Sequence, residues 1–154
     1  MKALVTGASR GIGKAIAEAL MADGVQVAVC ASSGAPDLPR AALSSRCDVS
    51  DESQVAALFA EAGRCDCVVL NAGVLERGPI EKFTSGQWDR VLNVNLRGAF
   101  LCAREAFRTG ATRILALASH FICRRNYTSQ TAAPCTFSNR SGVRPFSFTR
   151  HWRC

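Results

Sequence analysis

Short apolar runs alternate with longer amphipathic segments over the first 119 residues. The runs have the length and continuity of strands that are covered on both faces, as in a parallel sheet. We therefore expect five strands, the third poorer than the others, at residues 2–5, 25–30, 41–49, 65–70 and 114–118.

The segments after the first and third runs have the 3.6-residue period of helices. The first helix begins near Gly11 and ends at Gly24, a residue suited to a helix C-terminus. The second has Ser50 or Asp51 as its cap and stops near Gly63. Their apolar stripes are expected at Ile12, Ile16 and Leu20 in the first helix and at Val55, Leu58 and Phe59 in the second.

The longest predicted helix runs from Ser85 to about Phe107 and begins with Thr84-x-x-Gln87, which has the form of a capping box. Asn95 lies on the predicted buried side. A buried amide needs partners, so Asn95 either bonds backbone groups or serves a site. The buried stripe is expected at Trp88, Leu92, Leu96, Ala99 and Ala103, with Arg90, Asn93, Arg97 and Arg104 on the other side.

The alternation of strands and helices predicts the α/β class with a Rossmann-like, doubly wound parallel sheet. Right-handed crossovers give the strand order 3-2-1-4-5. Residues 32–39 contain two prolines and a glycine, so a loop shortens or replaces the crossover helix there.

A glycine-rich turn, T-G-A-S-R-G-I-G, joins the first strand to the first helix at residues 6–13. Gly7 lets the chain leave the strand in a conformation closed to other residues. Gly11 lets backbone N–H groups approach a pyrophosphate, and Gly13 lets the helix pack close to the sheet. Because the turn lies between a strand and a helix, it predicts a dinucleotide-binding unit.

Three further motifs follow in order: C-D-V-S at 47–50, L-N-A-G at 70–73 and V-N-L-R-G-A-F at 94–100. With the glycine turn, they make residues 1 to about 119 resemble the short-chain dehydrogenase/reductase family, most closely its 3-oxoacyl-acyl-carrier-protein reductases. Taken alone, Asp48 also fits a helix-capping or loop carboxylate. The resemblance implies that Gly7, Ser9, Arg10, Gly11, Ile12 and Gly13 surround the cofactor phosphates, Asp48 and Val49 meet the adenine, and Asn71, Ala72 and Gly73 lie beside the ribose.

The end of the second strand favours NADP(H) over NAD(H). An acidic residue there would accept hydrogen bonds from a ribose 2′-hydroxyl and repel a 2′-phosphate. This chain has Ala31 instead, followed by Ser32 and Ser33. Arg10 in the phosphate turn can pair with a phosphate, although it also fits a solvated charge. We therefore add Ser32 to the predicted cofactor-binding residues.

The resemblance also implies a carbonyl–alcohol oxidoreductase acting on small molecules, with Asn95, Ser119 and Tyr127 as catalytic residues. The family's tyrosine needs a nearby lysine to lower its pKa. Thr131 occupies the position where the lysine is expected, and the chain's lysines are Lys2, Lys14 and Lys82. We therefore expect weak or no turnover, and Tyr127 also fits an incidental aromatic of the tail.

The composition changes after residue 119. All 12 acidic residues precede that point, whereas residues 120–154 carry six arginines and neither acids nor leucines. The net charge of +7 therefore belongs mainly to the tail. We predict an incomplete dinucleotide-binding domain at 1–119, without the family's C-terminal strands, and a poorly ordered basic tail at 120–154. We interpret the chain as a family member truncated or frame-shifted after about residue 119, which leaves the fifth strand as an open edge.

The eight cysteines include no C-x-x-C pair, so we expect buried, reduced thiols, with disulfides as the alternative. Cys123, Cys135, His151 and Cys154 fit no ligand spacing, and we predict no metal site. The sequence shows no signal region and no apolar run of membrane-spanning length. We therefore expect a cytoplasmic protein with no membrane association.

Two other readings stay open. The chain fits a non-catalytic dinucleotide-binding or subunit-interaction module, forming a homo-oligomer through the long helix at 85–107. The arginines and aromatic residues of the tail fit a contact with single-stranded nucleic acid. Unselected out-of-frame sequence would look the same, so the composition disfavours a nucleic-acid partner.

Overall fold

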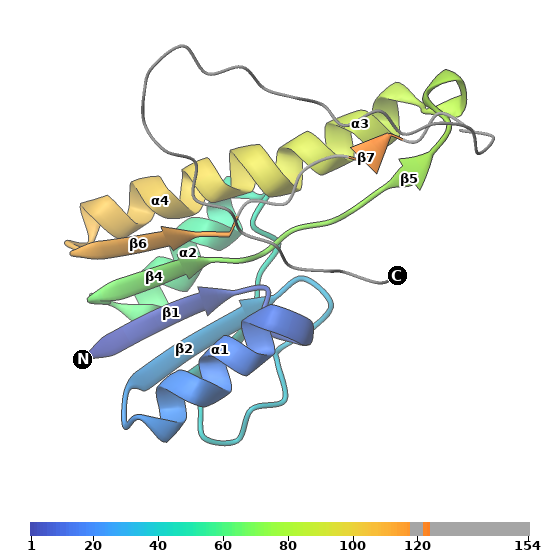
Figure 1. The fold of residues 1–154 in the computed structure, drawn as a ribbon. Helices are drawn as coiled ribbons and strands as arrows, with labels where there is room; N and C mark the ends of the chain where they lie inside the picture. The colour runs from blue at the N-terminus through green and yellow to red at the C-terminus, as the bar shows by residue number, and fades with distance from the viewer. Residues whose placement is uncertain (118–121, 124–154) are drawn as a thin grey trace, which may run out of the picture.

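A computed structural model describes residues 1–117 and 122–123. Its main sheet is parallel and has the order β3-β2-β1-β4-β6 (Figure 1). This confirms the predicted α/β class and strand order, because β6 is the fifth strand of the main sheet. The strands are β1 (Lys2–Thr6), β2 (Gln26–Ala31), β3 (Leu43–Arg46), β4 (Cys67–Leu70) and β6 (Arg113–Ala116).

A second, two-stranded sheet was not predicted from the sequence. It pairs β5 (Arg77–Gly78) with β7 (Ile122–Cys123) in parallel. A short 3₁₀ helix, η1 (Ile80–Lys82), follows β5. Strands of two residues carry too little pattern for recognition by periodicity.

Helices cover the two faces of the main sheet (Figure 1). One face packs on α1 (Gly11–Ala22), and the other packs on α2 (Glu52–Ala62) and α4 (Ala99–Arg108). Alternate strand residues divide between two apolar cores. Leu4 and Val68 belong to the core under α2 and α4, whereas Val5 and Val69 belong to the core under α1.

The first helix ends as predicted, but it is rotated about its axis from the expected orientation. The N–H of Gly24 donates to the Met21 carbonyl at 3.2 Å, which closes the C-terminus. Ile12 is 65% exposed, so its predicted place on the buried stripe is wrong. The buried residues are Gly13, Ala17 and Met21, because the helix lies close to the sheet through its small side chains, with Ile16 and Leu20 at the flank.

The second helix confirms its predicted cap, stripe and stop. The Asp51 carboxylate accepts from the Ser53 and Gln54 N–H groups at 2.9 and 3.1 Å. Val55, Leu58 and Phe59 are buried, and Gly63 is the C-cap. Between β2 and β3 the structure has turns and loop in place of a crossover helix, as the prolines of that segment predicted.

The long predicted helix is one rod made of α3 (Ser85–Leu92), a π-helical segment η2 (Asn93–Gly98) and α4. The Thr84–Gln87 capping box is confirmed. At the π segment the rod lies so close to the β3–α2 connection that a Cβ on Gly98 would lie 2.7 Å from Val49 Cγ2. This close contact is one of the places where the rod packs against the rest of the domain.

The predicted buried stripe of this rod is wrong for its three large residues. Trp88, Leu92 and Leu96 are 46, 37 and 67% exposed. The rod carries two apolar stripes, and the one with smaller residues faces the sheet because it permits the closer approach at Gly98. Ala99 and Ala103 are half-buried beside it. The buried residues are Val91, Gly98, Leu101, Cys102 and Ala106.

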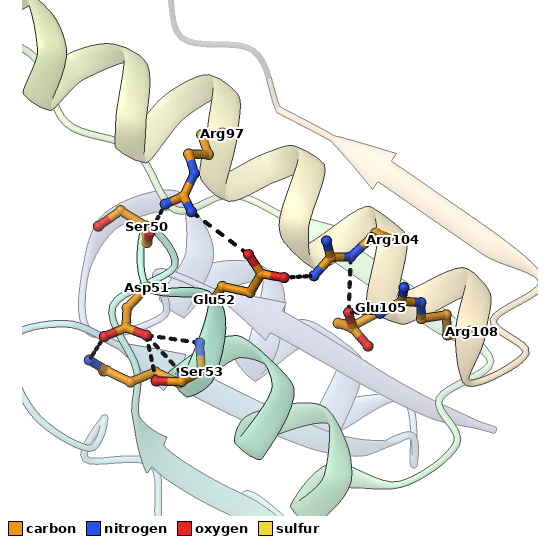
Figure 2. A network of polar contacts seen from close by, with 9 residues as sticks. Ser50, Asp51, Glu52, Ser53, Arg97, Arg104, Glu105 and Arg108 are labelled. Atoms are coloured by element: carbon orange, nitrogen blue, oxygen red, sulfur yellow. Dashed lines mark hydrogen bonds and ion pairs between the residues drawn. The ribbon is translucent and has the colours of Figure 1, made fainter.

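Two arginines of the rod, which the sequence analysis put on the side opposite the predicted buried stripe, join it to α2 (Figure 2). Arg97 donates to the Ser50 carbonyl and lies 3.8 Å from the Glu52 carboxylate. Arg104 reaches Glu52 at 2.7 Å and Glu105 at 3.1 Å. The Arg104 guanidinium holds the pKa of Glu52 below its ordinary value.

Candidate dinucleotide-binding site

A cavity of about 510 Å³ opens at the carboxyl ends of β1, β2, β3 and β4. The strand order changes direction at β1, and ligands of open α/β sheets bind at such a point. All the residues predicted to hold the cofactor line this cavity, and it brings them together from four loops. They are Gly7, Ser9, Arg10, Gly11, Ile12, Gly13, Ser32, Asp48, Val49, Asn71, Ala72 and Gly73.

The glycine turn has the backbone that its sequence predicted. Gly7 and Gly11 have φ angles of 69° and 59°, which side chains other than glycine rarely adopt. A Cβ on Gly13 would overlap the Asn71 amide and lie 2.5 Å from the Gly7 carbonyl oxygen, so the helix packs as closely as predicted. At Gly11 a Cβ would meet nothing within 4 Å, so the turn leaves open space on that side.

The N-terminus of α1 fits a phosphate group. No side chain caps this end of the helix, and its first turn holds no acidic residue. The first N–H groups of a helix have no partner within the helix, and its dipole favours an anion there. An uncapped helix of 12 residues after a glycine turn therefore suits a pyrophosphate, as in the dinucleotide-binding fingerprint.

Thr6 and Asn71 fasten the ends of β1 and β4 beneath the cavity. The buried Thr6 hydroxyl accepts from the Asn71 and Ala72 N–H groups at 3.0 and 3.1 Å and donates to the Val69 carbonyl at 3.3 Å. The Asn71 amide donates to the carbonyls of Thr6 and Gly7 at 2.9 and 3.0 Å. Asn71 lines the cavity, and its amide also fixes the glycine turn.

Asp48 has a local structural role beside its place in the cavity wall. Its carboxylate accepts from the Ser50 N–H at 2.9 Å and from the Ser50 hydroxyl at 2.7 Å. This is the loop-carboxylate alternative that the sequence left open, and it does not conflict with cavity lining. Among the described residues that line the cavity, Asp48 is the one acidic residue.

Asn95 bonds backbone groups, which is the structural alternative considered from the sequence. Its amide donates to the Val74 carbonyl at 2.9 Å, and its oxygen accepts from the Val74 N–H at 2.8 Å. Because Val74 lines the cavity, Asn95 positions the cavity wall from the π-helical segment. Ser119 and Tyr127, the other predicted catalytic residues, lie outside the described residues.

Six lining residues were not among the predicted cofactor-binding residues: Ala31, Ser33, Cys47, Val74, Arg90 and Val94. Ala31 and Ser33 entered the sequence analysis only through the choice of cofactor. Cys47 and Val74 adjoin predicted residues, so their position in the chain is the signal that could have found them. Arg90 and Val94 come from the rod, one turn apart. Val94 adjoins the predicted Asn95, whereas Arg90 was expected on the side of the rod opposite the buried stripe. Arg90 donates to the Glu76 carboxylate at 2.9 Å.

The thiols of the described residues are buried and free, as expected: Cys30, Cys47, Cys65, Cys67 and Cys102. Burial raises the pKa of Cys102 to about 12, and a hydrogen bond with Cys47 raises that of Cys30. In residues 1–117 and 122–123, no group of three potential metal ligands occurs. Nor does that part of the chain contain a helix with the length and apolar character needed to span a bilayer.

Together, the fold and the cavity define an α/β protein of the nucleotide-binding, Rossmann-like class. Residues 1–126 match the family model described as short chain dehydrogenase, and the chain belongs to the short-chain dehydrogenase/reductase family.

Among its relatives, the cis-4-hydroxycyclohexanecarboxylate dehydrogenase of Sinomonas cyclohexanicum is 40% identical over 119 residues, which are 69% of this chain and 48% of the relative. Versicolorin reductase 1 of Aspergillus parasiticus is 37% identical over 137 residues, covering 79% and 52%. A solved short chain dehydrogenase from Burkholderia cenocepacia J2315, in complex with NADP, superposes with a TM-score of 0.63 at 32% identity, covering 74% of this chain and 53% of that one. The chain thus spans about half the length of these relatives.

Proposed function

We propose that the chain binds NADP(H) in this cavity and that its family-level reaction interconverts a carbonyl and an alcohol by hydride transfer. The cavity carries the proposal, since residues assigned to pyrophosphate, ribose and adenine from separate motifs line it together. The named relatives are dehydrogenases and reductases, and one solved relative holds NADP. Arg10 and Ala31 favour the 2′-phosphorylated cofactor for the reasons given above.

The proposal gives each group of residues a task. The first turn of α1 binds the pyrophosphate, Asp48 and Val49 contact the adenine, and Asn95 holds the Val74 segment in place. The nicotinamide of the bound cofactor supplies or accepts the hydride. Ser119 polarises the substrate carbonyl, and Tyr127 exchanges the proton. The substrate is a small carbonyl or alcohol, and the likeness to 3-oxoacyl-acyl-carrier-protein reductases stays a prediction.

A second candidate is a non-catalytic dinucleotide-binding or subunit-interaction module. The observation that favours it is chemical: the chain has no lysine four residues after Tyr127 to lower the pKa of that phenol. The exposed stripe of the rod supports pairing between copies through residues 85–107. Its members are Trp88, Leu92, Leu96, Phe100 and Phe107.

Titration with NADPH, followed by a carbonyl-reduction assay, tests both functions. We expect saturable NADPH binding that is tighter than NADH binding, with slow or no turnover. Binding without any turnover supports the module, and turnover rejects it. A chain that is folded by circular dichroism but binds neither dinucleotide contradicts both candidates.

A further inference from the structure

Arg46 does not line the cavity, but it is hydrogen-bonded to a residue that does, Ser32. It is the last residue of β3 and pairs with Ala31 in the parallel ladder. Its Nε donates to the Ser32 carbonyl at 3.2 Å. Ala31, Ser32 and Ser33 line the cavity, so the guanidinium lies beside the residues that follow β2.

The side chains of β3 alternate in a way that sends Arg46 toward the α1 face. Ser45 reaches Glu61 of α2 at 3.4 Å, and Cys47 is packed in the core under α2 and α4. Arg46 lies between Ser45 and Cys47 in the strand, so its side chain points to the opposite face, the one that packs on α1. Arg10 is the N-cap of α1 on that same face. The sheet order β3-β2-β1 then places the end of β2 between Arg46 and the glycine turn.

The charges near this place suit an anion. In the described part of the chain, neither Arg46 nor Arg10 takes part in an ion pair, and both are exposed. Arg46 uses Nε on Ser32, and its terminal amino groups have no partner within residues 1–117 and 122–123. Two terminal N–H groups of a guanidinium match two oxygens of a phosphate.

We propose that Arg46 binds the 2′-phosphate of NADP(H) from the β3 side, opposite Arg10. This inference rests on the proposed function and adds a second, separate cation to it. Arg46 then determines the choice of cofactor, because a 2′-hydroxyl offers this guanidinium no charge to neutralise.

The competing explanation is that Arg46 only fixes the loop after β2 through the Ser32 carbonyl. The two roles differ in their dependence on the ligand. Loss of a loop anchor weakens every adenine nucleotide alike, whereas loss of a phosphate ligand weakens only nucleotides with a 2′-phosphate.

The test compares 2′,5′-ADP with 5′-AMP by calorimetric titration, using the wild-type chain, Arg46→Ala, Arg46→Lys and Arg40→Ala. Arg40→Ala is the matched control, because Arg40 also donates to a backbone carbonyl, that of Met21 at 3.2 Å. Met21 belongs to the C-terminal turn of α1 and, unlike Ser32, does not line the cavity. For Arg46→Ala we expect the affinity for 2′,5′-ADP to fall roughly tenfold, the size typical of one charged hydrogen-bonding partner, with 5′-AMP unchanged. Arg46→Lys restores part of the loss.

Equal losses for both nucleotides, or no loss for either, would overturn the inference while the proposed function stands. A folded wild-type chain that binds NADPH, NADH and both fragments too weakly to measure would overturn the proposed function, and the inference with it. Raising the salt concentration is a further readout. Added salt should weaken 2′,5′-ADP binding to the wild-type chain more than to Arg46→Ala.

Discussion

The centre of the main sheet and its β6 edge differ in how they are covered. Leu4 and Val5 of β1 are fully buried. Leu115 of β6 lies on the same face as its ladder partner Val69, yet it is 57% exposed and Val69 only 3%. Within the described residues, α1 covers that face over β1 and β2, and no element covers it over β6.

This difference separates the predicted cofactor-binding residues from two of the predicted catalytic residues, Ser119 and Tyr127. Every predicted cofactor residue lies in the covered part, where Thr6 and Asn71 fix the turn through hydrogen bonds between β1 and β4. The predicted Ser119 and Tyr127 follow the uncovered strand in the sequence. The cavity is therefore lined by residues other than these two, and the proposed dinucleotide binding does not depend on turnover.

The largest expected effect comes from comparing two phenylalanines. Phe59 is 1% exposed in the core under α2, and Phe107 is 70% exposed at the end of the rod. Phe59→Ala should destabilise the fold by about 3–5 kcal/mol through lost burial and a cavity. Phe107→Ala should change the free energy of unfolding by less than about 0.5 kcal/mol. Urea unfolding followed by circular dichroism measures both, and a costly Phe107→Ala would show that the rod's outer face is covered in solution.

The second prediction concerns the glycine turn. Gly13→Ala places a Cβ against the Asn71 amide and the Gly7 carbonyl, so the turn must shift. We expect the affinity for NADPH to fall by roughly tenfold or more, because α1 moves away from the phosphate position. Gly86→Ala is the control, since its Cβ would meet only Thr84 Oγ1 at 4.0 Å. Unchanged NADPH binding by Gly13→Ala would contradict the assignment of this turn to the cofactor.

The third prediction tests the open edge of β6. Leu115→Lys should leave the free energy of unfolding within about 0.5 kcal/mol of the wild-type value, because the side chain is largely exposed. It should also reduce self-association, since a charge on an edge strand opposes edge-to-edge pairing. Analytical ultracentrifugation measures the association. The control is Val69→Lys, at the buried ladder partner of Leu115, which should unfold the domain. Equal changes in the free energy of unfolding for the two variants would contradict the difference in coverage between the centre of the sheet and its β6 edge.

Local rules were enough to predict the five strands of the main sheet, the caps of the second and long helices, and the glycine turn. The continuous apolar run of β4 and the capping box at Thr84 depend on near neighbours in the chain, so the sequence displays them. The cofactor-binding residues that line the cavity could be predicted from the sequence for the same reason. Each motif directly follows a strand whose carboxyl end meets the same edge of the sheet.

The orientation of the helices could not be predicted in this way. The rod has two apolar stripes, and only the tertiary contact of Gly98 with Val49 selects the one with the smaller residues. Its π-helical segment also breaks the 3.6-residue period on which the prediction relied. The positions of Arg46 and Arg90 near the cavity depend on which strands and loops become neighbours in the fold. No functional role was therefore predicted for either residue from the sequence.

The smallest predicted effect is acid sensitivity of the α2 cap, Asp51. Hydrogen bonds from Ser53 and Gln54 lower the pKa of Asp51 to about 2. A carboxyl whose pKa is lower in the folded state contributes stability above its unfolded value, and the contribution disappears as the pH falls through the folded value. Asn is an equally good cap but does not titrate. The wild-type chain should therefore exceed Asp51→Asn slightly in melting temperature at pH 6, with the difference fading between about pH 4 and pH 2. A difference that grows on acidification would show that the Asp51 carboxylate does not stabilise the helix.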